Sequence, residues 1–342
     1  MTDRREILLR GLDLARLRGL EIGPLMSPFV AKSDGDVVYV DHADTATLRQ
    51  KYAADPNVQV DQIVDVDAVW GERSLLECLD GRKVDYVIAS HVAEHVPDLV
   101  TWLQEIEAVL ASGGELRLAL PDKRFSFDCL RDEARFTDVI HAYIMRARQP
   151  LPHALLDCVL DVAANADAEQ IHCGTQLRGD IQRCFSFEHA LDFVRDARES
   201  GRYIDVHCWV VTPRRFAELM ERLVEVGLIR LACTEFVDTI TGSFDFYVTM
   251  RLSADRDCTM ASWRRMAEAA RDDPQAPLAN MRGSSPAGLA PASDEVAWLR
   301  GRIAAMEAST SWRITAPLRA ATSLLRAIGG RGRKRNTHSA PD

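Results

Sequence analysis

The sequence predicts an α/β fold in which a doubly wound, mostly parallel sheet carries a helical insertion and a helical C-terminal tail. Residues 84–121 give the clearest signal. An apolar, β-branched run over 84–89 predicts a buried strand. Apolar residues then recur at helical spacing from Leu99 to Leu110, and a second apolar run over 115–120 predicts another strand. This order is a βαβ unit, so we expect ligands beyond the carboxyl ends of the strands.

Alternating strands and helices precede this unit, as a doubly wound sheet requires. The expected elements are a helix over 4–18, a very short strand over 20–23, a buried strand over 37–40, a helix over 45–53, a strand over 60–66 and a helix over 72–79. Gly113 and Gly114 are expected to cap the helix that ends near Leu110, because glycine adopts the left-handed conformation without a Cβ penalty.

A different pattern follows the βαβ unit. Residues 128–200 are mostly helical in character, and we interpret them as an insertion that forms a lid. A strand is expected over 203–211. Thr212-Pro213 then suits the N-cap and first position of a helix. The last strand, over 244–252, is expected to run antiparallel.

Three regions are expected along the chain. Residues 1–255 form the α/β domain, and residues 256–293 form a helix and a flexible linker rich in Pro, Ala, Gly and Ser. Residues 294–342 form a short coiled-coil segment and a basic tail. Seven of the basic residues and one acidic residue fall within 311–342, so the body is more acidic than the whole chain.

Composition excludes several functional classes. A net charge of −9 over 342 residues argues against a dedicated nucleic-acid binder. The eight cysteines are scattered without a C-x-x-C pair, which is typical of reduced thiols, and no zinc-binding spacing is present, so no residue is assigned to a metal. The charged first 19 residues do not predict a signal peptide, and no apolar run is long enough to span a membrane. We therefore expect a cytoplasmic protein.

Several segments together resemble a known family. LEIGPLMSP, VVYVDHAD, IVDVD, VDYVIASHVAEHV and VLASGGELRLALPDKR are similar to class I S-adenosylmethionine-dependent methyltransferases of the type 11 branch. The likeness covers residues 20–123 well and 203–252 loosely. DVHCWVVTPRRFAELMERL is similar to members associated with cell-surface polysaccharide biosynthesis. The resemblance implies a Rossmann-like methyltransferase fold, S-adenosyl-L-methionine as cofactor, and a methyl acceptor that is a glycan or contains a sugar, with O-methylation as the expected reaction.

The resemblance also assigns cofactor-binding residues to the strand ends. Gly23, with Glu21 beside it, belongs to a loop assigned to the methionine part, where glycine permits close approach and a following helix N-terminus would offer N–H groups. Asp41 would accept hydrogen bonds from the ribose hydroxyls, a geometry that also serves a nicotinamide cofactor. Asp65, or equally Asp67, at the third strand's tip would contact the adenine amino group. Ser90 would lie under the reactive methyl.

Catalytic candidates follow the fourth and fifth strands. His91 is the first candidate base because histidine titrates near neutral pH. Asp122 and Lys123 are the second candidates for contact with the acceptor. His95 is expected to be structural, and His91 could equally be a structural loop residue.

The insertion is the expected acceptor-binding element. Its arginines and aromatic residues could bind an anionic nucleotide-sugar, although an ordinary helical cap with a solvated face explains each residue singly. The residues concerned are His141, Tyr143, Arg146, Arg148, His153, His172, Arg178, Arg183 and Phe185. The basic tail is expected to contact a glycosyltransferase or the inner-membrane surface, and a disordered solubilising tail is the alternative.

Two other functions fit the sequence less well. A non-catalytic scaffold could use a degenerate methyltransferase domain and dock glycosyltransferases through residues 294–335. A nicotinamide-dependent oxidoreductase would share the fold, but the glycine fingerprint of dinucleotide binding is absent.

Overall fold

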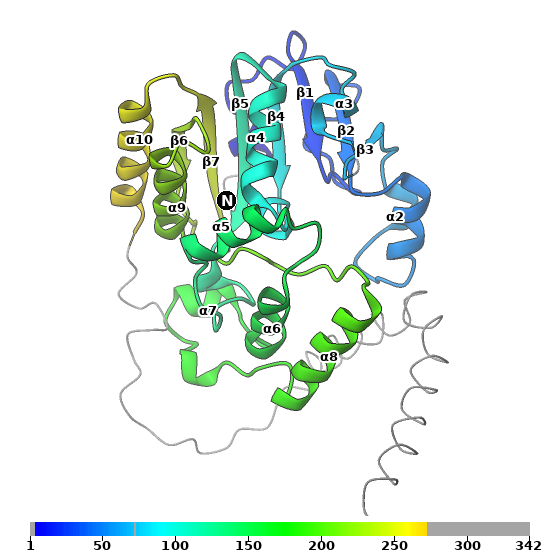
Figure 1. Cartoon of the computed structure of the whole chain (residues 1–342), viewed down its shortest axis with the longest axis vertical. Helices are drawn as coiled ribbons and strands as arrows, with labels where there is room; N and C mark the ends of the chain where they lie inside the picture. The colour runs from blue at the N-terminus through cyan, green and yellow to red at the C-terminus, as the bar shows by residue number, and fades with distance from the viewer. Residues whose placement is uncertain (1–3, 72, 272–342) are drawn as a thin grey trace, which may run out of the picture. The chain divides into compact units, whose positions relative to one another are not determined.

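The structure is a computed structural model that describes residues 4–71 and 73–271 (Figure 1). The predicted linker, coiled-coil segment and basic tail lie outside the described residues. The helices are α1 Arg4–Leu9, α2 Thr45–Tyr52, α3 Leu75–Cys78, α4 Leu99–Val109, α5 Phe136–Met145, α6 Pro152–Asp161, α7 Ala168–His172, α8 Phe187–Ser200, α9 Pro213–Glu225 and α10 Arg256–Ala269. The strands are β1 Arg18–Ile22, β2 Asp36–Asp41, β3 Ala68–Val69, β4 Val84–Ser90, β5 Leu110–Pro121, β6 Leu231–Val237 and β7 Asp245–Leu252. Short 3₁₀ turns cover η1 Val60–Gln62, η2 Ala93–His95, η3 Lys123–Phe125 and η4 Arg178–Asp180.

The strands form one mostly parallel sheet. Its order is β3-β2-β1-β4-β5-β7-β6. The pairs from β3 to β5 are parallel, whereas β7 runs antiparallel to both β5 and β6. The predicted doubly wound α/β class is therefore confirmed, together with the antiparallel last strand. The order reverses between β1 and β4, which makes that position the topological switch point of the sheet.

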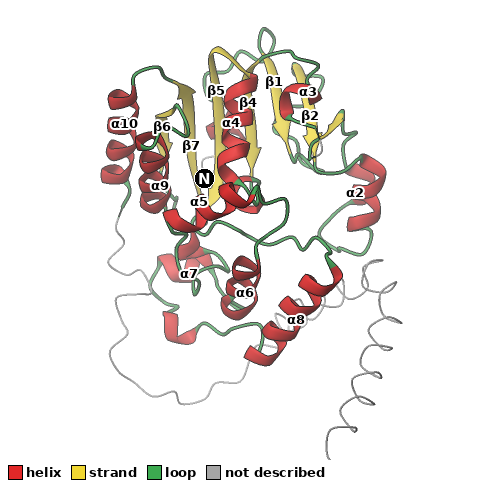
Figure 2. Ribbon diagram, viewed as in Figure 1, coloured by secondary structure: helices red, strands yellow, loops and turns green. Residues whose placement is uncertain are grey.

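Helices α3, α4, α9 and α10 lie over one face of the sheet (Figure 2), and this face carries the larger core. Alternate strand residues such as Val87 and Leu118 pack there against α3, α4, α9 and α10. Trp102 on α4 and Trp263 on α10 are both fully buried, and the Trp263 indole Nε1–H donates to the Leu231 carbonyl of β6. Helix α10 is therefore packed against the same face as α9 rather than extending away from the sheet.

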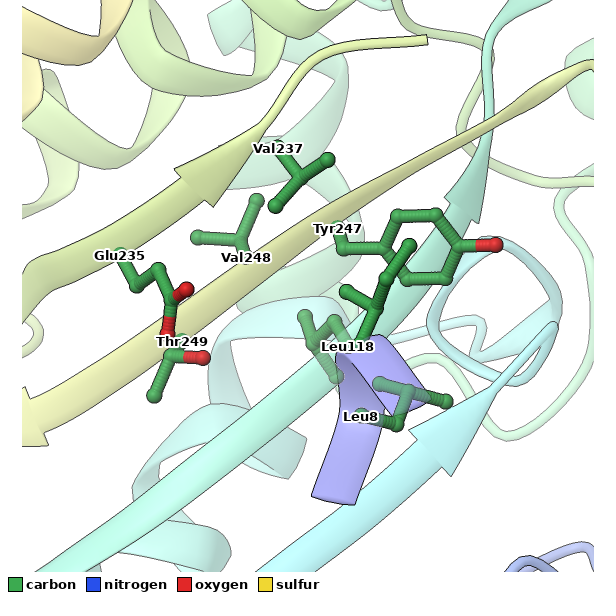
Figure 3. Close-up of a pocket in the computed structure, with 8 residues that line it drawn as sticks. Leu8, Leu118, Glu235, Val237, Tyr247, Val248 and Thr249 are labelled. Atoms are coloured by element: carbon green, nitrogen blue, oxygen red, sulfur yellow. The ribbon is translucent and has the colours of Figure 1, made fainter. Parts of the chain in front are cut away.

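The opposite face is covered by α1 and by the loop that follows β1. Ile7 and Leu8 of α1 pack with Val30 of the loop against tyrosines of β2, β4 and β7. The buried Arg117 side chain donates to the carbonyls of Leu8 and Arg10, and so satisfies backbone acceptors at the end of α1. A cavity of about 10 Å³ lies between α1 and strands β5 to β7 (Figure 3), which is room for about one water molecule and no ligand.

The third strand differs from the prediction. Residues 60–62 form a 3₁₀ turn, and β3 is the two-residue strand Ala68–Val69, which pairs with the end of β2. The apolar alternation over 60–66 predicted a strand, but the backbone N–H groups of this segment donate to loop residues and not to a neighbouring strand. The Val64 N–H donates to the Leu25 carbonyl, and the Val66 N–H donates to Thr45 Oγ1.

The predicted strand over 203–211 is also wrong. This segment is extended but lies outside the sheet, apart from one isolated bridge between Val211 and Asp122. The N–H groups of Cys208 and Trp209 donate instead to the Glu94 carbonyl, at 2.6 and 3.2 Å. The sheet edge is completed by β6, a strand that the sequence analysis missed because its residues LACTEFV are only partly apolar.

Two helix ends also differ from the prediction. Helix α1 ends at Leu9 rather than near residue 18, and Gly11 follows with φ +76°. Helix α4 ends at Val109, and Leu110 already has an extended conformation that begins β5. Gly113 therefore does not cap the helix; with φ +80° it turns the chain at the start of β5.

We predict that Gly19→Ala destabilises the sheet. Gly19 of β1 pairs in register with Tyr86 of β4, and a Cβ at Gly19 would lie 2.0 Å from the Tyr86 ring. We expect a loss of about 1–3 kcal/mol in the free energy of unfolding, measured by urea denaturation, because buried overpacking forces shifts in neighbouring atoms.

The matched control is Gly179→Ala, whose added Cβ would meet no atom within 4 Å. It should change stability by no more than about 0.5 kcal/mol. The cost of Gly19→Ala should also fall in a Tyr86→Ala background. Equal costs for the two glycines, or an unchanged cost without the tyrosine ring, would contradict this packing.

Candidate functional site

Three predicted site residues meet at one edge of the sheet. Gly23 follows β1, Asp41 ends β2 and Ser90 ends β4, and β1 lies between the other two strands. The carboxyl ends of β1 and β4 flank the topological switch point, which is where open α/β sheets bind ligands. The fold therefore brings Gly23, Asp41 and Ser90 together as the sequence analysis expected.

Gly23 has a conformation and surroundings that favour glycine. Its φ is +67°, and its N–H donates to the Val40 carbonyl of the neighbouring strand at 2.9 Å. A Cβ there would lie 3.0 Å from Val92 Cγ2. Glycine therefore adds no side-chain atom of its own between the backbone and a ligand, and Val92 lies beside it.

The loop from Gly23 to Gly35 contains no helix, contrary to the expectation that a helix N-terminus follows Gly23. Glu21 is the reason that this loop is ordered otherwise. Its buried carboxylate accepts the N–H groups of Phe29 and Val30, at 2.7 and 3.1 Å. Burial raises the pKa of Glu21 to about 7, against the lowering effect of these two hydrogen bonds. Glu21 thus contacts the loop backbone and holds the loop against the sheet.

Asp41 retains one oxygen that can accept a hydrogen bond. Its carboxylate is 6% exposed; Oδ1 accepts the His42 N–H at 2.7 Å and lies 2.6 Å from the His42 ring nitrogen Nδ1. Within the described part of the chain, Oδ2 accepts no hydrogen bond. This arrangement fits a carboxylate whose second oxygen is available to a ribose hydroxyl.

Asp65 does not lie at the tip of the third strand. It precedes β3, and its side chain is exposed in the loop. Asp67, the alternative, has its Oδ2 in contact with the Tyr39 N–H at 2.7 Å and with Lys32 Nζ at 2.5 Å. The adenine contact was assigned to Asp65 because a strand was expected to end there, and no strand does. That contact stays a prediction.

His91 lies between two buried carboxylates. Its Nδ1 is 3.1 Å from Glu94 Oε1, and its Nε2 is 3.0 Å from Asp245 Oδ1. Burial disfavours the imidazolium, but the contacts with Asp245 and Glu94 outweigh it and raise the pKa of His91 to about 9. His91 is therefore a cation at neutral pH, with neither nitrogen available to remove a proton, and this placement disfavours the expected role as general base.

The same network continues to the N-terminus and to Ser90. Arg4 Nη2 donates to Ser90 Oγ at 3.0 Å, and Arg4 Nε lies 3.1 Å from Asp245 Oδ2. Asp245 begins β7, so these contacts join α1, β4 and β7 at the carboxyl edge of β4. Arg4 therefore holds the Ser90 side chain, and pairing of β4 with β5 holds its backbone.

Asp122 is fully buried and its carboxylate is occupied. Oδ1 and Oδ2 accept hydrogen bonds from the Arg124 guanidinium, and Oδ2 also accepts from Thr239 Oγ1 at 2.8 Å. These contacts are structural, because they join the end of β5 to the loop before β7. Neighbouring Lys123 is also buried, and burial lowers the pKa of its ammonium group. Asp122 and Lys123 were both candidates for contact with the acceptor. Of these two, Lys123 is the one whose burial favours the neutral amine.

Much of the predicted acceptor-binding set is engaged within the protein. His172 stacks on Phe125 with ring centroids 3.6 Å apart, and its Nε2 contacts the Ser243 carbonyl. Arg178 donates to the Leu130 carbonyl, and Arg183 pairs with Asp161. The exposed members of the set are His141, Arg146, Arg148, His153 and Arg183, and Arg148 donates to the Gly71 carbonyl.

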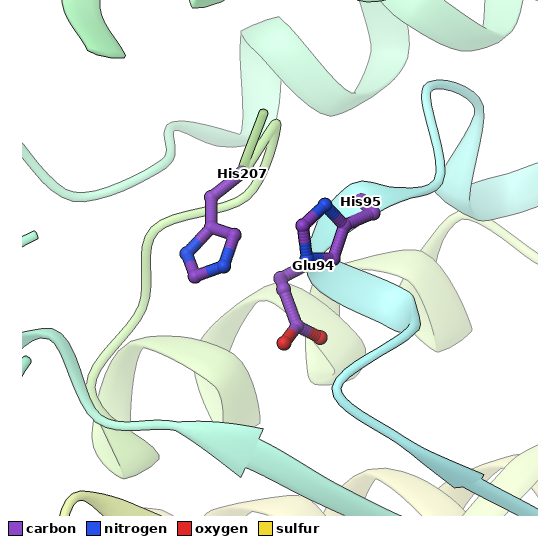
Figure 4. A group of neighbouring side chains, drawn as sticks. All are labelled: Glu94, His95 and His207. Atoms are coloured by element: carbon purple, nitrogen blue, oxygen red, sulfur yellow. The ribbon is translucent and has the colours of Figure 1, made fainter. Parts of the chain in front are cut away.

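The structure also brings together residues that the sequence analysis did not combine. Glu94 and His95 of η2 and His207 of the extended segment 205–211 place potential ligand atoms within 4.8 Å of one another (Figure 4). His207 follows His95 by more than a hundred residues, so no spacing rule could pair them. Within the described residues this is the one group of His, Cys, Asp and Glu arranged to hold a metal ion.

One region of the chain matches a known protein family. Residues 18–118 match the family described as "Methyltransferase domain". This segment contains β1 to β4, α4 and most of β5, and therefore the strand ends at which Gly23, Asp41 and Ser90 meet. No curated protein matches the chain.

Solved structures resemble the chain at low identity. The CcbJ methyltransferase from Streptomyces caelestis is 13% identical, with 73% of this chain and 94% of that chain covered and a TM-score of 0.33. The N-methyltransferase NodS from Bradyrhizobium japonicum is also 13% identical, with 73% and 94% covered and a TM-score of 0.34. Magnesium protoporphyrin IX methyltransferase from Synechocystis, solved with bound SAH, is 8% identical, with 73% and 80% covered and a TM-score of 0.34. At these scores the likeness carries no argument about substrate, and the fold stands on the strand order above, which is consistent with a Rossmann-like methyltransferase fold.

In the part of the chain that the structure describes, no helix is both long enough and apolar enough to cross a membrane.

We predict that Glu21 makes the protein less stable as pH rises. Because the folded pKa of about 7 lies above the ordinary value of 4.5, the folded state binds more protons between these values, and stability falls with pH there. Between pH 5 and 8 this group should lower the free energy of unfolding by roughly 2–3 kcal/mol.

Urea denaturation at both pH values measures this effect. Glu21→Gln should remove it, whereas Glu188→Gln, an exposed substitution on α8, should retain the wild-type dependence. Parallel pH profiles for wild type and Glu21→Gln would rule out a raised pKa at this position.

Proposed function

We propose that this protein is an S-adenosylmethionine-dependent methyltransferase. The observation that carries the proposal is the arrangement of Gly23, Asp41 and Ser90 at adjacent strand ends on either side of the switch point. The match of residues 18–118 to a methyltransferase-domain family supports it independently. S-adenosylmethionine supplies the transferred methyl group as a sulfonium, and the protein's task is to position that group against an acceptor.

Each strand end has a defined part in this proposal. Asp41 binds the ribose hydroxyls through Oδ2, the oxygen left available by His42. Gly23 lets the ligand approach the end of β1 closely. The His91 imidazolium keeps the Glu94 and Asp245 carboxylates in place and so fixes the turn after Ser90. A group other than His91 then removes the proton of the acceptor hydroxyl.

We further propose that the acceptor is a hydroxyl of a glycan or nucleotide-sugar in surface polysaccharide biosynthesis. The resemblance of segment 205–223 to members associated with that process supports this assignment. The insertion that contains α5 to α8 lies beyond the carboxyl ends of the strands (Figures 1 and 2), where an acceptor must enter. Contact with a glycosyltransferase or with the inner-membrane surface is assigned to the basic tail, outside the described residues.

We predict that Asp41→Ala weakens cofactor binding. Loss of hydrogen bonds to a charged acceptor should raise the dissociation constant of S-adenosylhomocysteine at least about tenfold, as measured by isothermal titration calorimetry. The control is Asp36→Ala at the opposite end of β2, where the exposed carboxylate pairs with Arg18. Its affinity should equal that of the wild type.

Two results would contradict the proposal. If the wild-type protein binds neither S-adenosylmethionine nor S-adenosylhomocysteine at high micromolar concentration, it is not a methyltransferase of this kind. If Asp41→Ala binds with unchanged affinity, the cofactor does not use this strand end.

We predict that sugar hydroxyls accept the methyl group. Incubation of the protein with S-adenosylmethionine carrying an isotopically labelled methyl group, and with nucleotide-sugars or polysaccharide fragments, should give labelled O-methyl sugars by mass spectrometry. Transfer to amines alone, with sugars unlabelled, would exclude the proposed acceptor while leaving the cofactor assignment in place.

A further inference from the structure

The cluster of Glu94, His95 and His207 has the composition of a metal site. Two residues come from the η2 turn after β4, and His207 is brought to them by the extended segment whose N–H groups donate to the Glu94 carbonyl. Figure 4 shows the two imidazole rings and the Glu94 side chain converging from these two elements. Two imidazoles and one carboxylate are a ligand set that Zn²⁺ and related ions use when one coordination position stays open to water or substrate.

Each of the two imidazoles is oriented by a carboxylate of its own. His95 Nδ1 lies 2.8 Å from Asp205 Oδ1, and His207 Nδ1 lies 2.5 Å from Asp128 Oδ2. An Nδ1–H that donates to a carboxylate leaves the lone pair on Nε2. Metal-binding histidines characteristically donate their other ring N–H to a carboxylate, which fixes the tautomer and raises the basicity of the ligand.

Glu94 provides the second and independent observation. Its side chain is 1% exposed, and Oε1 is engaged by His91. Oε2 is buried and has no hydrogen-bond partner within residues 4–71 and 73–271. A buried carboxylate oxygen without a partner is costly, and a bound cation would remove that cost. The oxygen belongs to the side chain that is grouped with the two imidazoles, so a ligand at this position would be a cation.

We propose that Glu94, His95 and His207 bind one divalent transition-metal ion of the Zn²⁺ type. Ligands at roughly 2.0–2.1 Å from a tetrahedral ion lie about 3.4 Å apart. The three ligand atoms lie within 4.8 Å, so binding requires a small closure. His95 can supply it, because its side chain is 32% exposed and lies at the rim of the cluster.

The site has a chemical role that rests on the proposed methyl transfer. An ion with three protein ligands keeps a position for an acceptor hydroxyl and favours its ionised form. The cluster begins four residues after Ser90, at the strand end assigned to the reacting methyl. This role would explain how a hydroxyl is activated at an edge where both ring nitrogens of His91 contact carboxylates.

The test measures metal binding alone, so its outcome is independent of methyl transfer. The full chain, stripped with a chelator, is titrated with Zn²⁺ by calorimetry, and Co²⁺ is added separately to record its visible spectrum. We expect one Zn²⁺ per chain at this site and a cobalt spectrum without thiolate bands.

Variants assign the binding to the cluster. His95→Gln and Glu94→Gln should each weaken Zn²⁺ binding by more than about 100-fold, and Asp205→Asn, which alters an orienting carboxylate, by about 10–100-fold. The control is the double substitution His141→Ala/His153→Ala, which removes two exposed histidines with ring centroids 6.0 Å apart. Its affinity should be unchanged.

His95 is the decisive position because it is partly exposed, and its replacement is the least disruptive to folding. Circular dichroism melting curves confirm that each variant is folded. Three results would overturn the proposal: no Zn²⁺ binding at high micromolar concentration, equal affinity in folded His95→Gln and wild type, or cobalt bands that show thiolate ligation.

Discussion

The contact of His91 with two buried carboxylates is the interaction on which the rest of the site depends. Glu94 and Asp245 would each be costly to bury as isolated charges, and the imidazolium between them offsets that cost. His91 reaches this position with φ +54°, a backbone conformation that is uncommon for a residue with a Cβ. The contact joins the end of β4 to the start of β7. It also engages one Glu94 oxygen, while the other has no hydrogen-bond partner among the described residues.

The other side of the switch point is shaped by Glu21. In many doubly wound sheets a helix follows the first strand and presents its N-terminus to a ligand anion. Here Glu21 binds the loop backbone at Phe29 and Val30, and the loop covers the sheet without a helix. In the proposed function, cofactor binding at this edge therefore depends on Asp41 and on close approach to Gly23 more than on a helix dipole.

The sequence predicted the parts of the fold that local patterns determine. The βαβ unit, β2 and the start of α9 at Thr212 were readable from apolar periodicity and capping residues. The two wrongly predicted strands lie where tertiary contacts override the apolar pattern. The Val64 N–H donates to a loop carbonyl, and the Val66 N–H donates to a hydroxyl. The apolar segment around Trp209 packs on a turn instead of joining the sheet. For the site, strand ends located Gly23, Asp41 and Ser90. The grouping of His207 with Glu94 and the pairing of His91 could not be predicted, because both depend on contacts between distant segments.

The proposed function divides this edge into a cofactor half at β1 and β2 and an acceptor half that begins at β4. A crystal structure of the protein with S-adenosylhomocysteine tests this most directly. The account predicts the ribose hydroxyls within hydrogen-bonding distance of Asp41 Oδ2, and the homocysteine part between Gly23 and Ser90. A ligand bound at any other surface, with Asp41 still in contact with His42 alone, would contradict it.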